Sequence, residues 1–205
     1  AESAGCFEHV WVGDTIMARP RLESLTLMAG VAARTKNVRI GPGCMASFPS
    51  RNPIILAYQW ASLDLMSNGR MIMAACMGPK LSLGYRWVDR RDPAEPLQEN
   101  EYTNMDVTVQ DRAARMVENV KILRMLWTQD RVTYEGRFHT LTDAFIEPKP
   151  VQSPPPIWMT GNPNLEGPEN VIRRNLRRVA RLGDGWMTGN SPPATMATQK
   201  KMILE

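Results

Sequence analysis

The sequence predicts an α/β protein with a parallel sheet, on two observations. Short apolar runs alternate with segments of helical period along most of the chain, which is the pattern of strand-helix-strand units. Glycine or polar residues follow the ends of several different runs, at Asp14, residues 41–47, Gly78 and residues 161–162. A doubly wound sheet and a (β/α)8 barrel both fit the alternation. We favour the barrel, because the carboxyl ends of its strands share one mouth where the active site lies.

The first elements are the end of a helix, a strand and a second helix. Residues 1–5 are typical of a helix end that stops at Gly5, and residues 10–12 form a β-branched run that ends before Asp14. From residue 21 to residue 33, apolar side chains recur at helical spacing. No G-x-G-x-x-G sequence opens any helix, which counts against a dinucleotide-binding fold.

The central stretch, residues 38–78, predicts a strand, a helix and a second strand. After the β-branched run 38–40, the glycines of Gly41-Pro42-Gly43 allow the backbone to approach another group closely. Asn52 caps a helix that has Pro53 at its first position and stops at residues 67–69. Residues 70–78 are apolar and too few for a typical helix, so we expect a strand buried on both faces.

The second half of the chain begins with a polar stretch, residues 80–110, that shows no clear period. So long a connection is usually a lid or a binding loop. Asp111 then caps an amphipathic helix, and residues 132–134 and 138–140 form a hairpin. Stiff proline-rich segments lead to a strand at 157–159, which an arginine-rich helix and a last strand at 186–188 follow.

Composition predicts one domain of an ordinary cytoplasmic enzyme, with 205 residues, 43% of them hydrophobic and 22% charged. No apolar run is long enough to span a membrane, and the first residues lack the features of a signal peptide. Cys6, Cys44 and Cys76 are odd in number and lack C-x-x-C spacing, which indicates reduced thiols with neither a disulfide nor a metal. The arginines of residues 173–181 could bind nucleic acid, but a solvated outer helix face is favoured because no RNA-binding motif accompanies them.

A series of short fragments, all in one order, resembles the bacterial luciferase-like monooxygenase family. The fragments are WVGD (11–14), RPRLE (19–23), LTL (25–27), AART (32–35), RIG (39–41), RNP (51–53), ASLD (61–64), SNGR (67–70), PKPVQ (148–152), PPIW (155–158) and GDGW (183–186). The resemblance covers nearly the whole chain apart from residues 80–110. It implies one incomplete (β/α)8 TIM barrel over residues 1–205, with an insertion loop at about 79–110. The family's first strand would precede Ala1 and at least one would follow Glu205, so we expect about six parallel strands and an open sheet.

The resemblance also implies an oxidoreductase that binds a reduced flavin in the mouth of the barrel. We expect a monooxygenase that uses reduced FMN and O2 on a small organic substrate, in a homo-oligomer that a flavin reductase supplies with reduced flavin. The alternative is an F420-dependent dehydrogenase or reductase, and the length of the loop 41–53 is nearer to those members. Two alternatives from other functional classes stay open: a barrel protein that has lost its cofactor, and a hydrolase or aldolase on the same fold. A hydrolase or aldolase would need a lysine, a histidine or paired carboxylates at strand ends, where the sequence offers Asp14.

The catalytic candidates are Asp14 and Thr15. Many members of the family carry a histidine where this chain has Thr15, so a histidine acid or base is absent from that position. His9 and His139 are interpreted as surface or core residues. Asp14 either accepts a hydrogen bond from flavin or substrate, which we favour, or caps the next segment.

The candidates for cofactor binding lie at the ends of predicted strands, and no metal site is expected. They fall at three of these strand ends: Gly43, Cys44 and Met45 at the first, Met77 and Gly78 at the second, and Thr160, Gly161 and Asn162 at the third. The methionines Met45, Met71, Met73 and Met77 are more often core gap-fillers than a flavin surface. We give equal weight to two interpretations of the turn at Gly161: it offers backbone N–H groups to a phosphate, or it is a plain turn. The family's bulge implies a cis peptide between Gly43 and Cys44.

Overall fold

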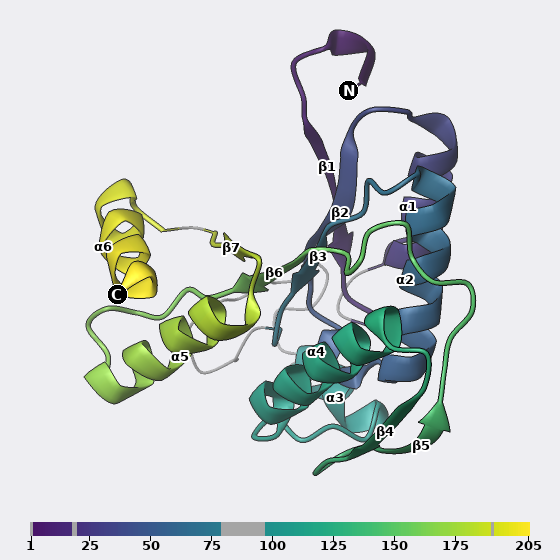
Figure 1. Cartoon of the computed structure of the whole chain (residues 1–205). Coiled ribbons are helices and arrows are strands. Elements are labelled where there is room, and N and C mark those ends of the chain that lie inside the picture. The colour runs from purple at the N-terminus through teal and green to yellow at the C-terminus, as the bar shows by residue number, and fades with distance from the viewer. Residues whose placement is uncertain (1, 18–19, 79–96, 190) are drawn as a thin grey trace.

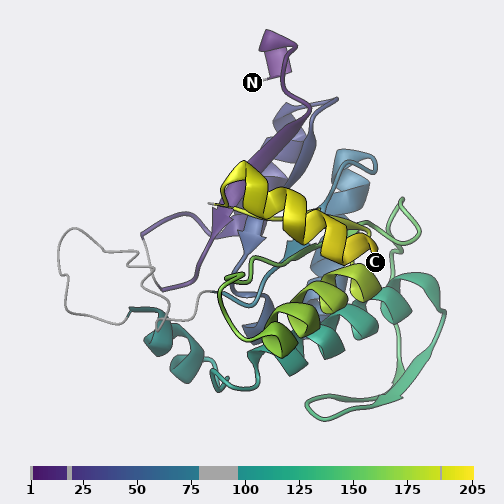
Figure 2. The same cartoon turned by 90° about the vertical axis from the view of Figure 1, so that its left-hand side faces the viewer.

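The computed structural model describes residues 2–17, 20–78, 97–189 and 191–205. Its main sheet has five parallel strands in the order β1-β2-β3-β6-β7, as Figures 1 and 2 show. The strands are β1 (His9–Asp14), β2 (Arg39–Met45), β3 (Met73–Ala75), β6 (Ile157–Thr160) and β7 (Gly185–Met187). The predicted parallel α/β sheet is confirmed. In the described residues it has five strands rather than six, and it is open, since β1 and β7 do not pair with each other.

Helices cover the sheet along its length. The helices are α1 (Ser24–Arg34), α2 (Pro53–Ser67), α3 (Leu97–Asn104), α4 (Arg112–Thr128), α5 (Glu169–Leu182) and α6 (Pro193–Leu204), with short 3-10 turns η1 (Glu2–Ala4) and η2 (Phe48–Ser50). In Figure 1, α1 and α2 lie beside β1–β3 and α4 packs on α2, whereas α5 lies against β6 and α6. None of the helices in the described ranges is long and apolar enough to cross a membrane.

The helix ends follow the local sequence signals. Asn52 accepts hydrogen bonds from the backbone N–H groups of Ile54 and Ile55, at 2.9 and 3.2 Å, and Pro53 takes the first position of α2. Asn68 ends α2 in the left-handed region at φ 56°, as the predicted stop requires. Asp111 precedes α4 as predicted, but its carboxylate makes no capping bond and accepts hydrogen bonds from the Thr108 hydroxyl and from Arg137 instead.

Two helices and several element boundaries differ from the sequence-based expectation; the strand expected at residues 70–78, for example, spans only Met73–Ala75. The assignment of residues 80–110 to a loop was wrong for α3, whose eight residues show almost no amphipathic pattern, and residues 79–96 lie outside the described part. α6 was not predicted, because only Gln199 of that helix is buried and its apolar residues trace no clear stripe. The predicted hairpin is confirmed as β4 (Val132–Glu135) with β5 (Thr140–Ala144), although the second strand begins later than expected.

The main hydrophobic core lies between the sheet and its covering helices. Met45, Met71 and Met73 are fully buried in it beside Trp60 of α2 and Leu123 of α4. The gap-filling role expected for these methionines is therefore confirmed. Met77 is partly buried and packs against the same core.

Aromatic side chains show that the sheet is curved. The ring centroids of Trp11 on β1 and Trp158 on β6 are 5.6 Å apart, although β2 and β3 lie between those strands. A Cβ atom at Gly41 would lie 2.7 Å from Trp11, and one at Gly185 would lie 2.5 Å from Trp158. Glycines on the neighbouring strands thus make room for both indoles on the concave face.

Candidate functional site at the strand ends

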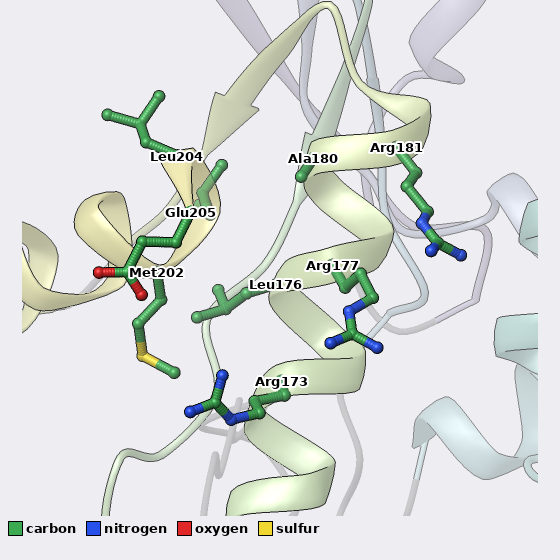
Figure 3. Close-up of a pocket in the computed structure, with 9 residues that line it drawn as sticks. Arg173, Leu176, Arg177, Ala180, Arg181, Met202, Leu204 and Glu205 are labelled. Carbon is green, nitrogen blue, oxygen red and sulfur yellow. The ribbon is translucent and has the colours of Figure 1, made fainter.

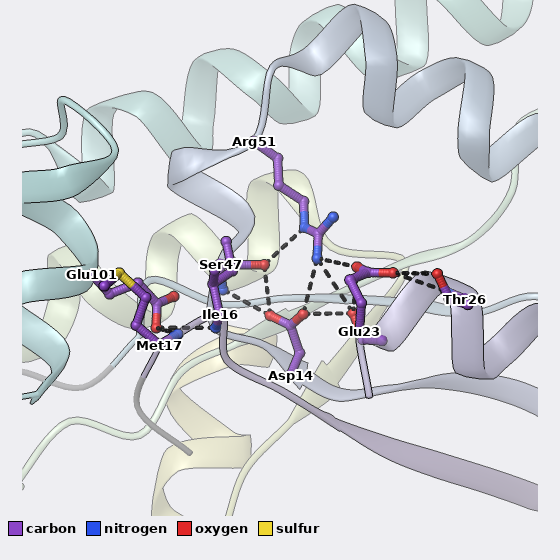
Figure 4. Close-up of polar contacts among 9 residues, drawn as sticks. Asp14, Ile16, Met17, Glu23, Thr26, Ser47, Arg51 and Glu101 are labelled. Carbon is purple, nitrogen blue, oxygen red and sulfur yellow. Dashed lines mark hydrogen bonds and ion pairs between the residues drawn. The ribbon is translucent and has the colours of Figure 1, made fainter. Parts of the chain in front are cut away.

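Asp14 stands at the end of β1 in a filled hydrogen-bonding network (Figure 4). Its Oδ1 atom accepts hydrogen bonds from the Ser24 hydroxyl at 2.6 Å and from Arg51 Nη2 at 3.2 Å. Its Oδ2 atom accepts from the Ser47 backbone N–H and the Ser47 hydroxyl, both at 2.8 Å. Asp14 is 5% exposed, and its carboxylate holds together Ser24 at the start of α1, Ser47 just after β2 and Arg51 two residues before α2.

Arg51 is the cation of this network and it has two anionic partners. Besides Asp14, its Nη2 atom bonds Glu23 at 2.7 Å, and its Nε donates to the Ser47 hydroxyl at 2.8 Å. Because four donors of the chain already occupy the Asp14 carboxylate, the geometry favours a positioning role for this residue. Direct contact of Asp14 with cofactor or substrate stays a prediction.

Thr15 follows directly and has the opposite character. Its hydroxyl oxygen is buried and finds no hydrogen-bond partner among the residues that the structure describes. The two residues after it are fixed, because Glu101 of α3 accepts hydrogen bonds from the backbone N–H groups of Ile16 and Met17, at 3.1 and 3.2 Å. Among the described residues, the Thr15 hydroxyl is therefore a buried polar group without a partner, and Glu101 holds the backbone that follows it.

The end of β3 is held in place by α3 and α4. The Tyr102 hydroxyl donates to the Met77 carbonyl at 2.8 Å, and Arg112 donates to the carbonyls of Met77 and Gly78 at 3.1 and 3.2 Å. Gly78 has φ 69°, and a Cβ atom there would overlap the Tyr102 hydroxyl. Burial raises the pKa of that hydroxyl, so it stays a donor.

The end of β2 contains the expected cis peptide between Gly43 and Cys44, which is confirmed. Gly43 is exposed, and a Cβ atom there would lie 3.1 Å from Trp11 Cβ. Met45 is fully buried in the core on the helix side of the sheet. For its predicted contact with a cofactor, the side chain would have to point to the opposite face of the strand. Cys44 is partly exposed, and the nearby Cys76, followed by burial, raises the pKa of its thiol.

The three predicted residues at and just after the end of β6 have different partners. Thr160 lies near Cys76, whose thiol pKa is lowered first by Cys44 and more weakly by Thr160. Gly161 donates its N–H to the Met187 carbonyl at 3.4 Å and accepts from Trp186 Nε1 at 2.8 Å. Asn162 bonds the Gly189 carbonyl and the Ser191 hydroxyl. These bonds favour a structural turn at Gly161 over a phosphate site.

Sequence reasoning missed several residues that the fold brings to these strand ends. Glu101 and Tyr102 lie in the helix that shows no periodic signal, so only the fold reveals them. Cys76 lies one residue beyond Ala75, on a strand next to that of Cys44, which only the pairing of β2 with β3 reveals. In the described ranges, no group of three or more His, Cys, Asp or Glu side chains is arranged to hold a metal ion.

A pocket of different composition lies between α5 and α6 (Figure 3). Arg173, Arg177 and Arg181 follow one another at four-residue spacing on its α5 side. They are exposed, as is Arg174, which fits the predicted solvated face. Arg178 departs from that prediction, since it is partly buried and burial, followed by the nearby Arg174, lowers its pKa.

Comparison with known proteins identifies the family. The luciferase-like monooxygenase model matches residues 1–93 and 94–201. The F420-dependent glucose-6-phosphate dehydrogenase of Amycolatopsis mediterranei (strain U-32) is 29% identical over 212 residues, covering 98% of this chain and 54% of that protein. The enzyme of the same name from Kineococcus radiotolerans is 26% identical over 192 residues, covering 91% and 49%. The chain spans about half the length of the curated relatives it matches.

Solved structures agree on the fold. The monooxygenase RslO1 from Streptomyces bottropensis superposes with a TM-score of 0.72 at 23% identity, over 96% of this chain and 54% of that one. An F420-dependent secondary alcohol dehydrogenase in complex with an F420-acetone adduct superposes with a TM-score of 0.67 at 22% identity, over 99% and 58%. With the open parallel sheet and the family model over nearly its whole length, the chain belongs to the luciferase-like monooxygenase family.

Proposed function

We propose that this protein is an F420-dependent oxidoreductase, which transfers a hydride between a small organic substrate and the deazaflavin. One observation carries the proposal: the curated relatives at 26–29% identity, over 85% or more of this chain, are F420-dependent glucose-6-phosphate dehydrogenases. The length of the loop 41–53 also favours F420 as the cofactor. The FMN-dependent monooxygenase that we first expected has less support, since the similar monooxygenase structure is 23% identical and shows the fold alone.

The residues at the strand ends suit a planar ring. Gly43 is exposed beside Trp11 and has no side chain, so a flat group can approach the backbone there. The buried hydroxyl of Thr15 lacks a partner in the described part of the chain, and burying such a group unpaired is unfavourable by about 1–3 kcal/mol. A ligand that hydrogen-bonds to Thr15 would remove that penalty.

When bound, F420 would supply the ring carbon that accepts or gives the hydride, and the protein would supply orientation and a dry surface. In this proposal Thr15 hydrogen-bonds to the ring or to the substrate. Asp14 holds the Ser47 loop and Glu101 holds the segment after Thr15, so both act as positioning residues. The concave wall beside the ring is the indole of Trp11.

Equilibrium binding of the two cofactors to the full-length protein tests the proposal. We expect F420 to bind more tightly than FMN, measured by quenching of tryptophan and deazaflavin fluorescence. Thr15→Val, which removes the hydroxyl and keeps the shape, should weaken F420 binding about fivefold or more, as the loss of one hydrogen bond of about 1 kcal/mol predicts. Thr198→Val on α6 is the matched control, because that hydroxyl bonds its own helix, and it should bind normally. Tight FMN binding without F420 binding would refute the proposal in favour of the monooxygenase, and binding of neither would favour a non-catalytic protein.

A further inference from the structure

We propose that the outer face of α2 binds the same face of a second copy of this chain, as an antiparallel helix pair about a two-fold axis. The surface, named here the α2 stripe, consists of five exposed apolar side chains with Gln59 and Ser62 between them. The five are Ile54, Ile55, Tyr58, Leu65 and Met66. The inference goes beyond the proposed hydride transfer and does not depend on which cofactor binds.

The chemistry of the α2 stripe is unlike that of a surface made for water. Its apolar side chains are between 36% and 58% exposed, and they recur at spacings of three and four residues, so they share one side of the helix. The structure describes the whole of α2, and its one charged residue, Asp64, is buried and accepts hydrogen bonds from Gln152 at 2.8 and 2.7 Å. A helix that is apolar on all sides is normally buried, so we expect another surface to cover this one.

Helix α5 shows how a solvated face of the same protein differs. Its exposed side chains include Arg173, Arg174, Arg177 and Arg181. The α2 stripe carries no charge, and its Ser62 hydroxyl donates to the Tyr58 carbonyl of the same helix at 3.0 Å. The hydroxyl is thus satisfied without water, and the stripe can become dry at little cost.

The place of α2 in the fold leaves the stripe to another molecule. Helices α1 and α4 pack against α2, and its buried residues, Trp60 among them, belong to the main core (Figure 1). The described sheet is open at β1 and β7. Further parallel strands would pair at those edges and would bring their helices next to the elements there, rather than onto the outer face of α2.

The order of residues in the α2 stripe matches itself when it is reversed. Positions 54, 55 and 58 lie as far before residue 60 as positions 66, 65 and 62 lie after it. A two-fold axis level with residue 60 therefore sets positions 54 and 55 against positions 66 and 65 of the second copy, which are large and apolar. Tyr58 faces the partner's Ser62, so a large side chain meets a small one, as ridge-into-groove packing requires. No charge loses its water in this pairing.

The area of the α2 stripe is in the range that a homodimer needs. A fully exposed side chain of this size presents about 200 Å², so the exposed fractions of the five leave about 500 Å² of apolar surface on each copy. Two copies would bury about 1,000 Å² at the stripe alone, which is the lower limit for a specific interface. Monomeric proteins rarely expose a larger apolar patch that binds nothing.

Sedimentation equilibrium of the full-length protein over a range of concentrations tests the inference. We expect the wild type to form dimers, and Tyr58→Glu, which places a charge beside the two-fold axis, to weaken self-association about a hundredfold or more. Val171→Glu is the matched control, because it puts the same charge on a 42% exposed apolar position of α5 and should leave self-association unchanged. Circular dichroism shows whether each variant is folded. A wild type that stays monomeric, or a folded Tyr58→Glu that associates as tightly as the wild type, would overturn the inference.

A charge pair tests the antiparallel register, and it serves as the test of the surface if Tyr58→Glu does not fold. Ile55→Lys sets a cation against the partner's Leu65 and should weaken self-association about tenfold or more. Adding Leu65→Glu gives each lysine a glutamate across the interface and should restore about tenfold of that affinity. The two positions lie about 15 Å apart along one helix, so they cannot pair within a copy. Unchanged self-association of Ile55→Lys, or a double variant that associates no better than Ile55→Lys, would overturn the inference.

Discussion

The two corners of the same sheet are held by different forces. At the β1–β2 corner, the buried Asp14 carboxylate is paired with Arg51 and sits above a core that includes Trp60 and Leu123. At the β6–β7 corner, the exposed Asn162 bonds neighbouring loops, and α6 buries Gln199 alone among its residues. Both corners have a polar residue after a strand, yet only the first is tied to the global stability of the fold.

This difference teaches how to interpret a polar residue at a strand end. Asp14 and Thr15 are neighbours in the sequence, but four donors fill the carboxylate and none in the described residues reaches the hydroxyl. A filled group positions the chain, whereas an unfilled buried group is available to a ligand. We therefore expect mutations at the first corner to change stability and mutations at Thr15 to change binding.

The largest effect should come from Asp14→Ala. Removing the carboxylate leaves the Ser24 hydroxyl and both Ser47 donors without their buried acceptor, although Arg51 keeps its pair with Glu23. The free energy of unfolding should therefore fall by about 3–5 kcal/mol, measured by chemical denaturation. Glu169→Ala is the matched control, because it breaks the exposed pair with Arg173 and should change stability by about 0.5 kcal/mol or less. Equal losses in both variants would show that the corner network contributes nothing beyond a surface ion pair.

A smaller and local effect should come from Asn162→Ala. The variant loses the bonds at 2.6 Å to Gly189 and at 2.5 Å from Ser191, both exposed, so the free energy of unfolding should fall by about 1 kcal/mol. Amide hydrogen exchange should become faster at Ser191 and stay unchanged in α2. Asn164→Ala, which removes one bond within its own turn, should leave Ser191 exchange at the wild-type rate. Faster exchange throughout α2 would contradict the separation of the two corners.

Much of the fold could be predicted because its signals are local. Pro53 after Asn52, the glycine and asparagine that stop α2, and the β-branched run before Gly41 each determine nearby backbone geometry. α3 carries no such signal, since its role is to place Glu101 and Tyr102 against loops far away in the sequence.

The candidate site was less predictable because its chemistry depends on long-range partners. The sequence indicates where strands end, but it does not show that Ser24, Ser47 and Arg51 fill the Asp14 carboxylate. Nor does it show that Cys44 and Cys76 lie on neighbouring strands, because that placement comes from the pairing of β2 with β3.

The central claim is that the cofactor ring lies on the concave face of the sheet beside Gly43. The most direct measurement is the F420 affinity of the full-length Gly43→Leu variant, compared with Gly30→Leu, since a Cβ atom at Gly30 on α1 meets nothing within 4 Å. The thermal midpoint and the far-ultraviolet circular dichroism show whether each variant is folded. We predict that folded Gly43→Leu loses F420 binding by about tenfold or more, at least about 1.4 kcal/mol, while Gly30→Leu binds normally. Normal affinity of Gly43→Leu for both F420 and FMN would contradict the placement of the site.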